Sequence, residues 1–302
     1  MRARYSSGLS EAMTDTTVNV NYKAQDQAAF GILVIGYNRP KHLEAVLTSL
    51  HMQGYSSLTH VWIDGTQGRR ELADANRSSV EVAQRFPVKE VLALKGHLGI
   101  EKLMLDALAD MSAAYRNVLV LEDDCFPVRG GVDLFRTSLD EVAGRPDVYS
   151  VYGHHFGSEP ADSRDFTRFQ GWGWAACSTQ IRKILPELAR LYMLPEPHYL
   201  AHVAAHMTPD IRARLDRTPP RNVLGVLQSF YSWDSATAFV TAQRGLLHVR
   251  TAEVAIRNTG IHAQSGHFHP GAPHLRKPPF SMITVEEAWD YFDAAGQDTG
   301  VS

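Results

Sequence analysis

The stretch from Asn117 to Pro127, NVLVLEDDCFP, constrains the fold of this chain more than any other. Its apolar run, Val118 to Leu121, has no polar alternation, which is typical of a strand buried on both faces of a parallel sheet. Glu122, Asp123 and Asp124, here called the acid triplet, fall at the carboxyl end of that strand. Ligands of open α/β sheets bind in the crevice outside such ends. The sequence therefore predicts a parallel sheet with a binding site at the acid triplet.

The chemistry of the acid triplet favours a divalent metal ion. Three neighbouring carboxylates repel one another unless a cation joins them. Their hard oxygen atoms suit Mg²⁺ or Mn²⁺, which keeps several waters and shares its other positions with substrate phosphates. A solvated acidic turn is the commoner explanation for acid triplets in general. The buried strand before this triplet favours a metal site instead.

Upstream of the acid triplet, apolar runs alternate with segments of helical periodicity. Strands are predicted at 30–37, 58–63 and 88–94, each followed by a helix, and the first helix is expected to open at Pro40. Strands that alternate with helices are the signature of a parallel sheet with right-handed crossovers. The predicted fold class is therefore α/β, with a mostly parallel central sheet flanked by helices.

The pattern becomes irregular in the C-terminal half. The segment 195–223 is rich in Pro, His and Arg and is predicted to be loop-dominated, with at most a short helix. Ser178 is expected to cap a helix that runs through Leu191. Other predicted elements are helices at 135–142, 230–245 and 285–292, a strand at 148–152, and one or two strands within 246–256.

The chain is expected to form one domain with two halves, because it contains no internal repeat and no low-complexity linker. The predicted domain covers 30–270, with a nucleotide-binding half at 30–130 and an acceptor half at 131–270. A flexible extension at 1–29, in which Met13 is an alternative start, and a tail at 271–302 flank it.

Composition excludes several classes of partner. The net charge is −3 and the two signs are mixed along the sequence, so there is no basic patch of the kind that binds nucleic acid or an anionic membrane. Two cysteines, Cys125 and Cys177, are too few for a disulfide framework, which suits a reducing compartment. The first two dozen residues contain no apolar run of signal-peptide or membrane-anchor length, so a cytoplasmic protein without a transmembrane segment is expected.

Two further polar residues each follow a predicted strand. The guanidinium of Arg39 can donate two parallel hydrogen bonds to phosphate oxygens. The carboxylate of Asp64 can accept a hydrogen bond from a base N–H or a ribose hydroxyl. Taken singly, Asp64-Gly65 can be interpreted as an ordinary turn dipeptide, and Arg39 can be interpreted as a surface residue. Their shared position beside the acid triplet makes them candidates for holding a nucleotide diphosphate.

Aromatic and acidic residues of the second half supply the remaining candidates. Gly171 to Ala176, GWGWAA, matches a dinucleotide fingerprint formally, but it lies far downstream of the first strand and is rejected. Trp172 is interpreted as an aromatic wall for a sugar ring or as core, and Trp174 as core. Asp234, beside Trp233, is either a general base or a first-turn acid, and its local sequence favours the second.

The order of the motifs resembles that of a GT-A glycosyltransferase, most of all the N-acetylglucosaminyltransferase I family and related bacterial sugar transferases. The resemblance covers about Gly31 to Phe268. In chain order the motifs are ILVIGYNRP, VWIDG, VLVLEDD, GWGW, SWD, RGLLHVRTAE, RNTG and SGHF.

The resemblance implies a role for each matching residue. Arg39 would contact the nucleotide diphosphate and Asp64 the uracil edge. The acid triplet would be a Glu-Asp-Asp version of the DXD motif, in which Asp124 ligates Mn²⁺ (or Mg²⁺), Asp123 faces the ribose and Glu122 the donor sugar.

The acceptor half receives its roles in the same way. Asp234 falls where the family keeps its catalytic base, which reverses the local preference. Trp172 and Trp233 would line the sugar or acceptor site, and His267 would lie in a loop that closes over the donor. The chain departs from the family in GHLGIEK, 96–102, and in the Pro- and His-containing segment between GWGW and SWD.

The resulting hypothesis is an inverting, metal-dependent enzyme that transfers a hexosyl or N-acetylhexosaminyl group. The donor would be a UDP-sugar, or another nucleotide diphosphate sugar, and the acceptor a hydroxyl of a glycan, small molecule or protein. Three alternatives stay open: a sugar-nucleotide nucleotidyltransferase, a glycoside hydrolase, and a catalytically silent nucleotide-sugar or glycan binding module. A glycoside hydrolase needs two carboxylates several ångströms apart across a bond, which adjacent acids on one turn do not supply. A nucleotidyltransferase would carry a glycine-rich loop after the first strand, and NRPKHLEAV has no glycine there.

Overall fold

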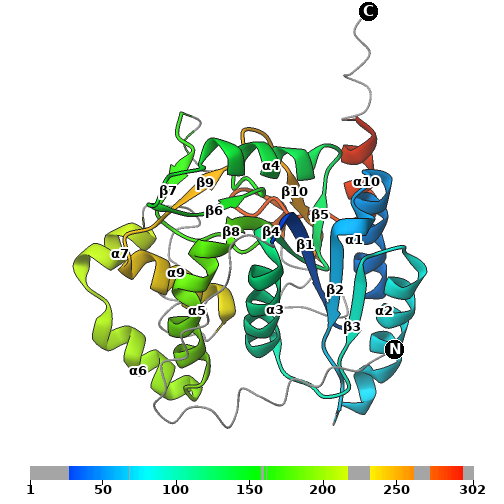
Figure 1. Ribbon diagram of the computed structural model, residues 1–302, viewed down its shortest axis with the longest axis horizontal. Coiled ribbons are helices and arrows are strands. Elements are labelled where there is room, and N and C mark those ends of the chain that lie inside the picture. The colour runs from blue at the N-terminus through cyan, green and yellow to red at the C-terminus, as the bar shows by residue number, and fades with distance from the viewer. Residues whose placement is uncertain are drawn as a thin grey trace, which may run out of the picture.

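A mixed β-sheet forms the centre of the protein, shown here as a computed structural model (Figure 1). The structure describes residues 27–67, 69–157, 160, 162–216, 232–261 and 273–294. Within these residues, eight strands form the central sheet in the order β3-β2-β1-β4-β8-β6-β9-β7. Their bounds are β1 Ala28–Gly36, β2 Thr59–Ile63, β3 Glu90–Ala93, β4 Tyr115–Glu122, β6 Val148–Tyr152, β7 Asp165–Phe166, β8 Trp174–Cys177 and β9 Leu247–Arg250.

Most strands of this sheet run in one direction. β1 pairs in parallel with β2 and β4, and β2 pairs in parallel with β3. β8 is antiparallel to both β4 and β6, so β6 and its parallel partner β9 run the same way as β4. β7 closes the far edge as an antiparallel strand. The carboxyl ends of β1, β2, β3, β4, β6 and β9 therefore meet at one edge, here called the carboxyl edge.

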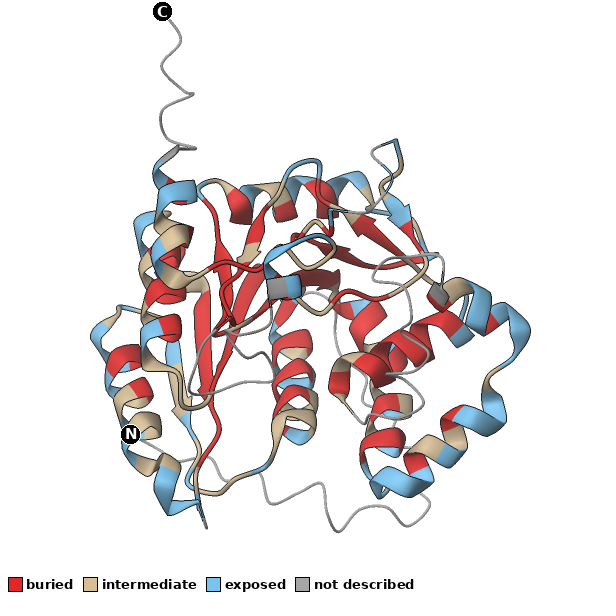
Figure 2. Cartoon of the chain, turned by 180° about the vertical axis from the view of Figure 1, so that it is seen from behind, coloured by how far each residue is buried: buried red, intermediate tan, exposed pale blue. Residues whose placement is uncertain are grey.

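Helices cover both faces of the sheet. Their bounds are α1 Pro40–Met52, α2 Ala73–Arg85, α3 Ile100–Ala114, α4 Gly131–Glu141, α5 Ser178–Tyr192, α6 Glu196–His206, α7 Pro209–Asp216, α9 Trp233–Gln243 and α10 Val285–Ala294. Apolar residues of α1, α2 and α4 pack in one core, and those of α3, α5, α6, α7 and α9 pack in the core on the opposite face. Figure 2 shows the buried residues concentrated in the sheet and on the inward helix faces. The predicted α/β class, with a mostly parallel central sheet flanked by helices, is confirmed.

A small second sheet attaches the chain after the acid triplet to the C-terminal segments. It pairs β5 Cys125–Pro127 with β10 Ile256–Asn258 in antiparallel register. Phe126 of β5 contacts Trp289 and Phe292 edge to face, so α10 packs on this sheet. The helix predicted at 285–292 is confirmed in α10.

Two predictions for the second half were wrong. The segment predicted to be loop-dominated contains two helices, α6 and α7, because Tyr199 with Val203 and Ile211 with Leu215 are spaced four residues apart and are buried. Ser178 does not cap α5 but is its first residue, and its hydroxyl donates to the carbonyl of Tyr115 at 2.5 Å. These helical signals are short, and Pro, His and Arg between them obscured the periodicity.

Several short elements complete the description. In the part of the chain that the structure describes, 3₁₀ segments lie at Ser56–Leu58, Arg70–Leu72 and Pro273–Arg276. Cys125 and Cys177 are both free thiols. None of the helices in the described part of the chain combines the length and the apolar character needed to cross a membrane.

The buried histidine of β9 predicts how stability depends on pH. His248 is fully buried, and its Nδ1 lies 2.8 Å from Oγ of Ser150. Burial and the charge of Arg214 lower the pKa of His248 to about 3. Below the ordinary histidine pKa of about 6.5 the unfolded chain therefore takes up a proton that the folded chain does not. The free energy of unfolding falls as the pH drops from 7 towards 3.

We expect this one imidazole to contribute about 2 kcal/mol of the loss in unfolding free energy between pH 7 and pH 5. Urea unfolding at pH 7 and pH 5 measures this loss. In His248→Gln the loss of unfolding free energy between the two pH values should be smaller than in the wild type by about 2 kcal/mol. His198→Gln, at an exposed position of α6, serves as the control. An unchanged pH dependence in His248→Gln would contradict the expectation.

Candidate active site

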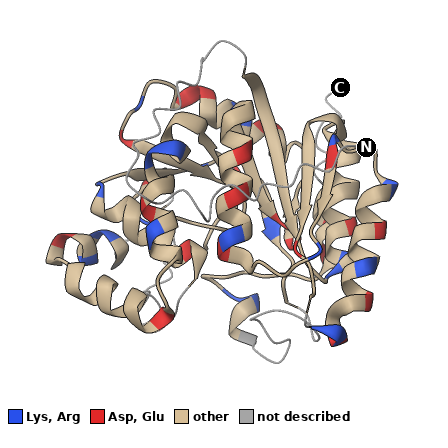
Figure 3. Cartoon of the chain, turned by 60° about the horizontal axis from the view of Figure 1, so that its bottom comes forward, with Lys and Arg blue, Asp and Glu red and all other residues tan. Residues whose placement is uncertain are grey.

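The carboxyl edge of the sheet collects the polar residues predicted to form a site. Arg39 follows β1, Asp64 follows β2, and the acid triplet spans the end of β4 and the turn after it. The GWGW motif leads into β8, and because β8 is antiparallel to β4, its start lies at the same edge. Figure 3 shows the acidic and basic residues at the ends of the central strands.

Arg39 forms a forked ion pair with two members of the acid triplet. Its Nη1 donates to Oδ2 of Asp124 at 2.7 Å and its Nη2 donates to Oδ1 of Asp123. The side chains of Asp123 and Asp124 are 3% and 12% exposed, so water screens this pair little. Burial works against the guanidinium charge, but the two carboxylates outweigh it and hold the pKa of Arg39 above its ordinary value. The pair compensates two buried charges.

Asp124 is fixed from behind by the RNTG motif at the end of β10. The backbone N–H and the hydroxyl of Thr259 donate to the carbonyl oxygen of Asp124 at 2.8 and 3.1 Å. Gly260 lies so close that a Cβ atom there would stand 2.6 Å from Oδ2 of Asp124. Any larger residue at 260 would displace this carboxylate, so the close approach requires glycine.

Burial opposes the carboxylate form of Glu122. Desolvation, the neighbouring Asp124 and the more distant Asp234 raise the pKa of Glu122 to about 8, against the opposing charge of Arg39. Burial also raises the pKa of Asp123, and Arg39 opposes that shift. Burial and the neighbouring carboxylates thus work against the charged forms of Glu122 and Asp123, and the charge of Arg39 favours them.

Asp234 belongs to the same electrostatic site as the acid triplet. It lies in the first turn of α9, where the hydroxyl of Ser232 donates to its Oδ1 at 2.5 Å. A Cβ atom at Gly171 would stand 3.3 Å from Cβ of Asp234, so the GWGW motif lies against this turn. The charge of Asp234 is among the causes that raise the pKa of Glu122. A Cβ atom at Gly173 would stand 2.5 Å from Cγ1 of Ile256, the residue before the RNTG motif, so the GWGW motif also lies against β10. The structure brings together the motifs EDD, GWGW, SWD and RNTG.

Arg168 is a site residue that sequence reasoning missed. Its neighbour Phe169 contacts the ring of Trp233 edge to face, with 5.8 Å between ring centroids. Desolvation lowers the pKa of Arg168 to about 10, and the charge of Asp234 opposes that shift. Arg168 thus supplies positive charge beside Asp234. Nothing in the local sequence, RFQG, distinguishes this arginine from a surface residue.

Asp64 has a structural task at the carboxyl edge. Its Oδ1 accepts from the backbone N–H groups of Gly65 and Leu98 at 2.9 and 2.8 Å, and its Oδ2 accepts from that of Gly99 at 3.0 Å. Nδ1 of His97 lies 2.7 Å from Oδ2. The three backbone N–H groups occupy three of the four lone-pair positions of the carboxylate. Asp64 fastens the loop before α3 to the end of β2, and its role as a base reader stays a prediction.

Asn76 is a second residue that sequence reasoning did not identify. Its side-chain amide donates to the carbonyl oxygens of Tyr37 and Asp64 at 2.7 and 2.8 Å. These carbonyls follow β1 and β2, so Asn76 of α2 holds the two strand ends in register beside Arg39. An asparagine inside a polar helix gives no sequence signal for this task.

The aromatic candidates have different environments. Trp174 is fully buried and stacks on Tyr149 at 5.8 Å between ring centroids, which confirms it as core. Trp233 is 5% exposed and lies 6.4 Å from Trp174 in the same cluster. Trp172 is partly exposed and contacts His154 and Phe156. A sugar-wall role therefore fits Trp172 better than Trp233. His267 lies outside the described residues.

The donor set of the triplet fits a hard divalent cation. Asp123 and Asp124 present carboxylate oxygens, and Arg39 leaves part of the negative charge uncompensated. Among the residues that the structure describes, no three His, Cys, Asp or Glu side chains converge as a ready metal-binding cluster. Mg²⁺ is usually held by one or two carboxylates, with water and substrate phosphates as its other ligands. The carboxylates of the acid triplet fit such a site, which does not need three protein ligands.

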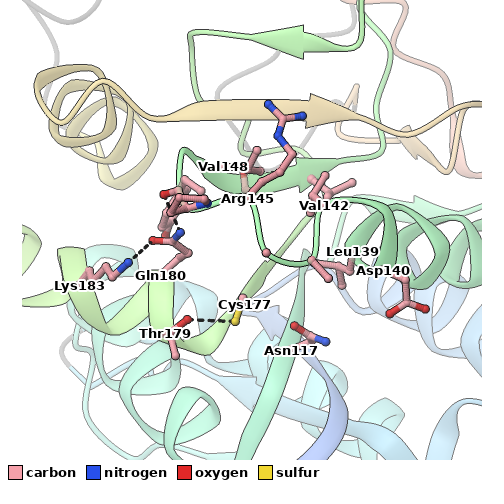
Figure 4. Close-up of a pocket in the computed structure, with 16 residues that line it drawn as sticks. Asn117, Leu139, Asp140, Val142, Arg145, Val148, Cys177, Thr179, Gln180 and Lys183 are labelled. Atoms are coloured by element: carbon pink, nitrogen blue, oxygen red, sulfur yellow. Dashed lines mark hydrogen bonds between the residues drawn. The ribbon is translucent and has the colours of Figure 1, made fainter.

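A separate pocket lies at the opposite edge of the sheet. It has a volume of about 360 Å³ and is lined by residues such as Asn117, Arg145, Cys177 and Lys183 (Figure 4). Asn117 precedes Glu122 by five residues of β4, which places this pocket about 16 Å from the acid triplet. Its basic residues already have partners, Arg145 with two carboxylates and Lys183 with Gln180. The pocket is not part of the candidate active site.

Comparisons with known proteins find similarity in structure only. No protein-family model matches the chain, and no curated protein sequence matches it. The mannosyltransferase PcManGT from Pyrobaculum calidifontis, in complex with GDP-Man and Mn²⁺, superimposes with a TM-score of 0.47 and 14% identity, over 91% of this chain and 76% of that one.

Two further structures overlap to a similar extent. The galactosyltransferase LgtC, in complex with donor and acceptor sugar analogues, gives a TM-score of 0.42 and 12% identity, over 90% of this chain and 97% of that one. Mouse xyloside xylosyltransferase 1 gives 0.42 and 11%, over 85% and 95% of the two chains. TM-scores below 0.5 do not by themselves establish a shared fold family or activity.

Removing the Arg39 guanidinium tests the compensation of the acid triplet. We expect Arg39→Gln to lower the free energy of unfolding by about 3 kcal/mol without added metal, because it leaves two largely buried carboxylates unpaired. Addition of Mn²⁺ should then stabilise this variant more than the wild type. Denaturant unfolding with and without Mn²⁺ measures both effects.

The exposed pair Arg77–Asp74 provides a matched control for this measurement. Its side chains are 65% and 91% exposed, so Arg77→Gln should change stability by less than about 1 kcal/mol. Equal losses in the two variants would show that Arg39 does not compensate buried charge.

Proposed function

We propose that this chain is a GT-A glycosyltransferase that transfers a sugar from a nucleotide diphosphate sugar to an acceptor hydroxyl. One observation carries the proposal. Arg39, the acid triplet, the RNTG motif and Asp234 meet at the carboxyl edge of a mostly parallel sheet. A site of this composition can hold a diphosphate and its cation while keeping a separate carboxylate for the acceptor.

The donor diphosphate would bind between Arg39 and the acid triplet. Asp124 is the residue that would hold Mn²⁺ or Mg²⁺, and Asp123 would face the ribose. The cation, when bound, neutralises charge on the diphosphate leaving group. Asp124 would exchange its contact with Arg39 for the cation. The guanidinium would then be released, and its planar fork suits phosphate oxygens. Arg39 thus stabilises the acids before donor binding and contacts the donor afterwards.

The acceptor hydroxyl would approach Asp234. A carboxylate within hydrogen-bond reach can take the hydroxyl proton as the oxygen attacks the anomeric carbon. Asp234 lies in the first turn of α9, the hydroxyl of Ser232 donates to its Oδ1, and the charge of Arg168 is nearby. Attack by an acceptor held there, opposite the departing diphosphate, would invert the configuration at that carbon.

Glu122 would face the donor sugar. A carboxyl group in either protonation state can form a hydrogen bond with a sugar hydroxyl. Trp172, partly exposed beside the same site, offers a flat apolar surface for a sugar ring. These two residues are the proposed contacts of the transferred sugar.

UDP is the proposed nucleotide, with a hexosyl or N-acetylhexosaminyl group as the transferred sugar. The support is the motif order shared with the N-acetylglucosaminyltransferase I family, in which Asp64 would meet the uracil edge. Because Asp64 holds the loop at 97–99 through backbone N–H groups, a base at this position would contact that loop too. The proposal therefore places the base against the start of α3.

A thermal-shift screen tests the donor class directly. We expect one nucleotide diphosphate sugar, UDP-linked, to raise the melting temperature in the presence of Mn²⁺ and not in the presence of EDTA. A ligand at 100 times its dissociation constant stabilises the native state by about 2.7 kcal/mol. Stabilisation by a nucleoside triphosphate together with a sugar phosphate, and not by the sugar nucleotide, would instead favour a nucleotidyltransferase.

Asp124→Asn tests the metal-binding residue. The variant should lose Mn²⁺-dependent donor binding in isothermal titration calorimetry, because an amide oxygen is a weaker ligand for a divalent ion than a carboxylate oxygen. Asp133→Asn, a change at an exposed acid of α4, is the control. Unchanged donor affinity in Asp124→Asn would rule out Asp124 as the metal ligand.

Asp234→Asn tests the base. We expect the rate of nucleotide release with acceptor, followed by mass spectrometry, to fall by about 10²- to 10⁴-fold while donor binding is kept. Asp210 is also a first-turn acid, on α7, so Asp210→Asn controls for the helix-dipole effect. Full activity in Asp234→Asn would refute the base assignment. Donor binding by the wild type without turnover on any acceptor would favour the silent binding module.

A further inference from the structure

The first turn of α1 is linked to the acid triplet by hydrogen bonds that pass through the RNTG motif. His42 lies in that turn and is only 4% exposed. Its Nε2 lies 3.0 Å from the carbonyl oxygen of Thr259, 217 residues away in the chain. A carbonyl oxygen can only accept, so Nε2 of His42 carries the proton and donates the hydrogen bond. The imidazole therefore fastens the RNTG motif to α1.

Thr259 extends this contact to Asp124. Its backbone N–H and its hydroxyl donate to the carbonyl oxygen of Asp124 at 2.8 and 3.1 Å. Thr259 is buried, so water has little access to these hydrogen bonds. Because its carbonyl accepts from His42 while its N–H and hydroxyl donate to Asp124, this one residue joins α1 to the turn after β4.

The peptide group between Thr259 and Gly260 is held at both ends. His42 donates to its carbonyl oxygen, and its N–H, which belongs to Gly260, donates to Oδ1 of Asn258 at 2.8 Å. Because a peptide group is planar, these two contacts fix its orientation. The orientation matters for the acid triplet, since a Cβ atom at Gly260 would stand only 2.6 Å from Oδ2 of Asp124. A rotation of this peptide group would change the space that the carboxylate occupies.

The small second sheet also restrains this loop, but one residue earlier. Asn258 of β10 pairs with Cys125 of β5, and its carbonyl oxygen accepts from the backbone N–H of Ile283 at 3.0 Å. Neither contact reaches the carbonyl oxygen of Thr259. His42 therefore adds a restraint that the second sheet does not supply.

Arg39 and His42 both act on Asp124 from the start of α1. Arg39 is the N-cap residue of this helix, and its Nη1 donates to Oδ2 of Asp124 at 2.7 Å. His42 follows three residues later and reaches the main chain of Asp124 through Thr259. If Arg39 leaves Asp124 to contact a diphosphate, the path through His42 stays in place.

We propose that His42 is a positioning residue of the candidate active site. It holds Thr259 and Gly260 so that Asp124 keeps its place when Arg39 turns to the donor. This inference rests on the proposed function, in which Asp124 holds the cation. Removing a group that orients a metal ligand typically lowers metal affinity or activity by about 10- to 100-fold. His42 acts through Thr259 and not on a substrate.

Calorimetric titration with UDP, once with Mn²⁺ and once with EDTA, measures the effect on the site. We expect the gain in UDP affinity that Mn²⁺ provides to fall by about 10-fold or more in His42→Leu, which has no donor for Thr259. His42→Asn should behave in the same way, because its side chain is shorter. His42→Gln should keep the gain within about threefold of the wild type, because its amide can donate in place of Nε2.

His60→Leu is the matched control for the loss of a buried imidazole. His60 is 7% exposed, and its Nε2 lies 2.7 Å from the hydroxyl of Tyr115. It is the second residue of β2, away from the carboxyl edge. His60→Leu should therefore cost stability in urea unfolding and keep the full Mn²⁺-dependent gain in UDP affinity.

Hydrogen exchange at the backbone N–H of Thr259 tests His42 without donor or metal. Relative to the N–H of Val120 in β4, exchange at Thr259 should be faster by about 10-fold in His42→Leu, because the loop opens locally more often. His42→Gln and His60→Leu should match the wild type in this ratio.

Unchanged exchange at Thr259 in His42→Leu would overturn the inference, and so would an unchanged Mn²⁺-dependent gain in UDP affinity. Equal losses of that gain in His42→Leu and His42→Gln would show that the imidazole packs and does not act by donating. An equal loss in His60→Leu would reveal a general effect of lower stability. If UDP binding by the wild type does not depend on Mn²⁺, the proposed function fails, and exchange at Thr259 still decides whether His42 holds the loop.

Discussion

The forked ion pair of Arg39 with Asp123 and Asp124 governs how the rest of the carboxyl edge is built. Two carboxylates that are nearly inaccessible to water need a cation, and the residue that supplies it follows β1, 85 residues earlier in the chain than Asp124. The pair exists only because β1 and β4 are parallel neighbours. Arg39 is consequently a structural residue of the carboxyl edge, and under the proposed function it also contacts the donor diphosphate.

Positions around this pair are fixed by backbone contacts rather than by side-chain packing. Thr259 donates twice to the carbonyl oxygen of Asp124, and Gly260 leaves room for the carboxylate. Asn76 bridges the carbonyls of Tyr37 and Asp64. Hydrogen bonds of this kind hold the side chains near one geometry before a ligand arrives, which reduces the cost of ordering them on binding.

Several parts of the fold were readable from the sequence, and the reason is local. β1, β2 and β4 are continuous apolar runs because each is buried on both faces, and α1 begins at the predicted Pro40. α6 and α7 were missed because each buries only a few apolar residues between Pro, His and Arg. β8 was missed because its four residues, WAAC, are too few to give a recognisable strand pattern.

The sequence by itself determined that a buried strand ends in three acids and that Arg39 and Asp64 follow neighbouring strands. Burial patterns and strand ends are local properties of the chain, so they can be predicted from the sequence alone. Only the tertiary structure decided that Arg39 pairs with Asp123 and Asp124, that both oxygens of Asp64 are occupied by backbone N–H groups, and that Arg168 stands near Asp234. These contacts join segments that are far apart in sequence. Their formation depends on the strand order and on the burial of each charged side chain.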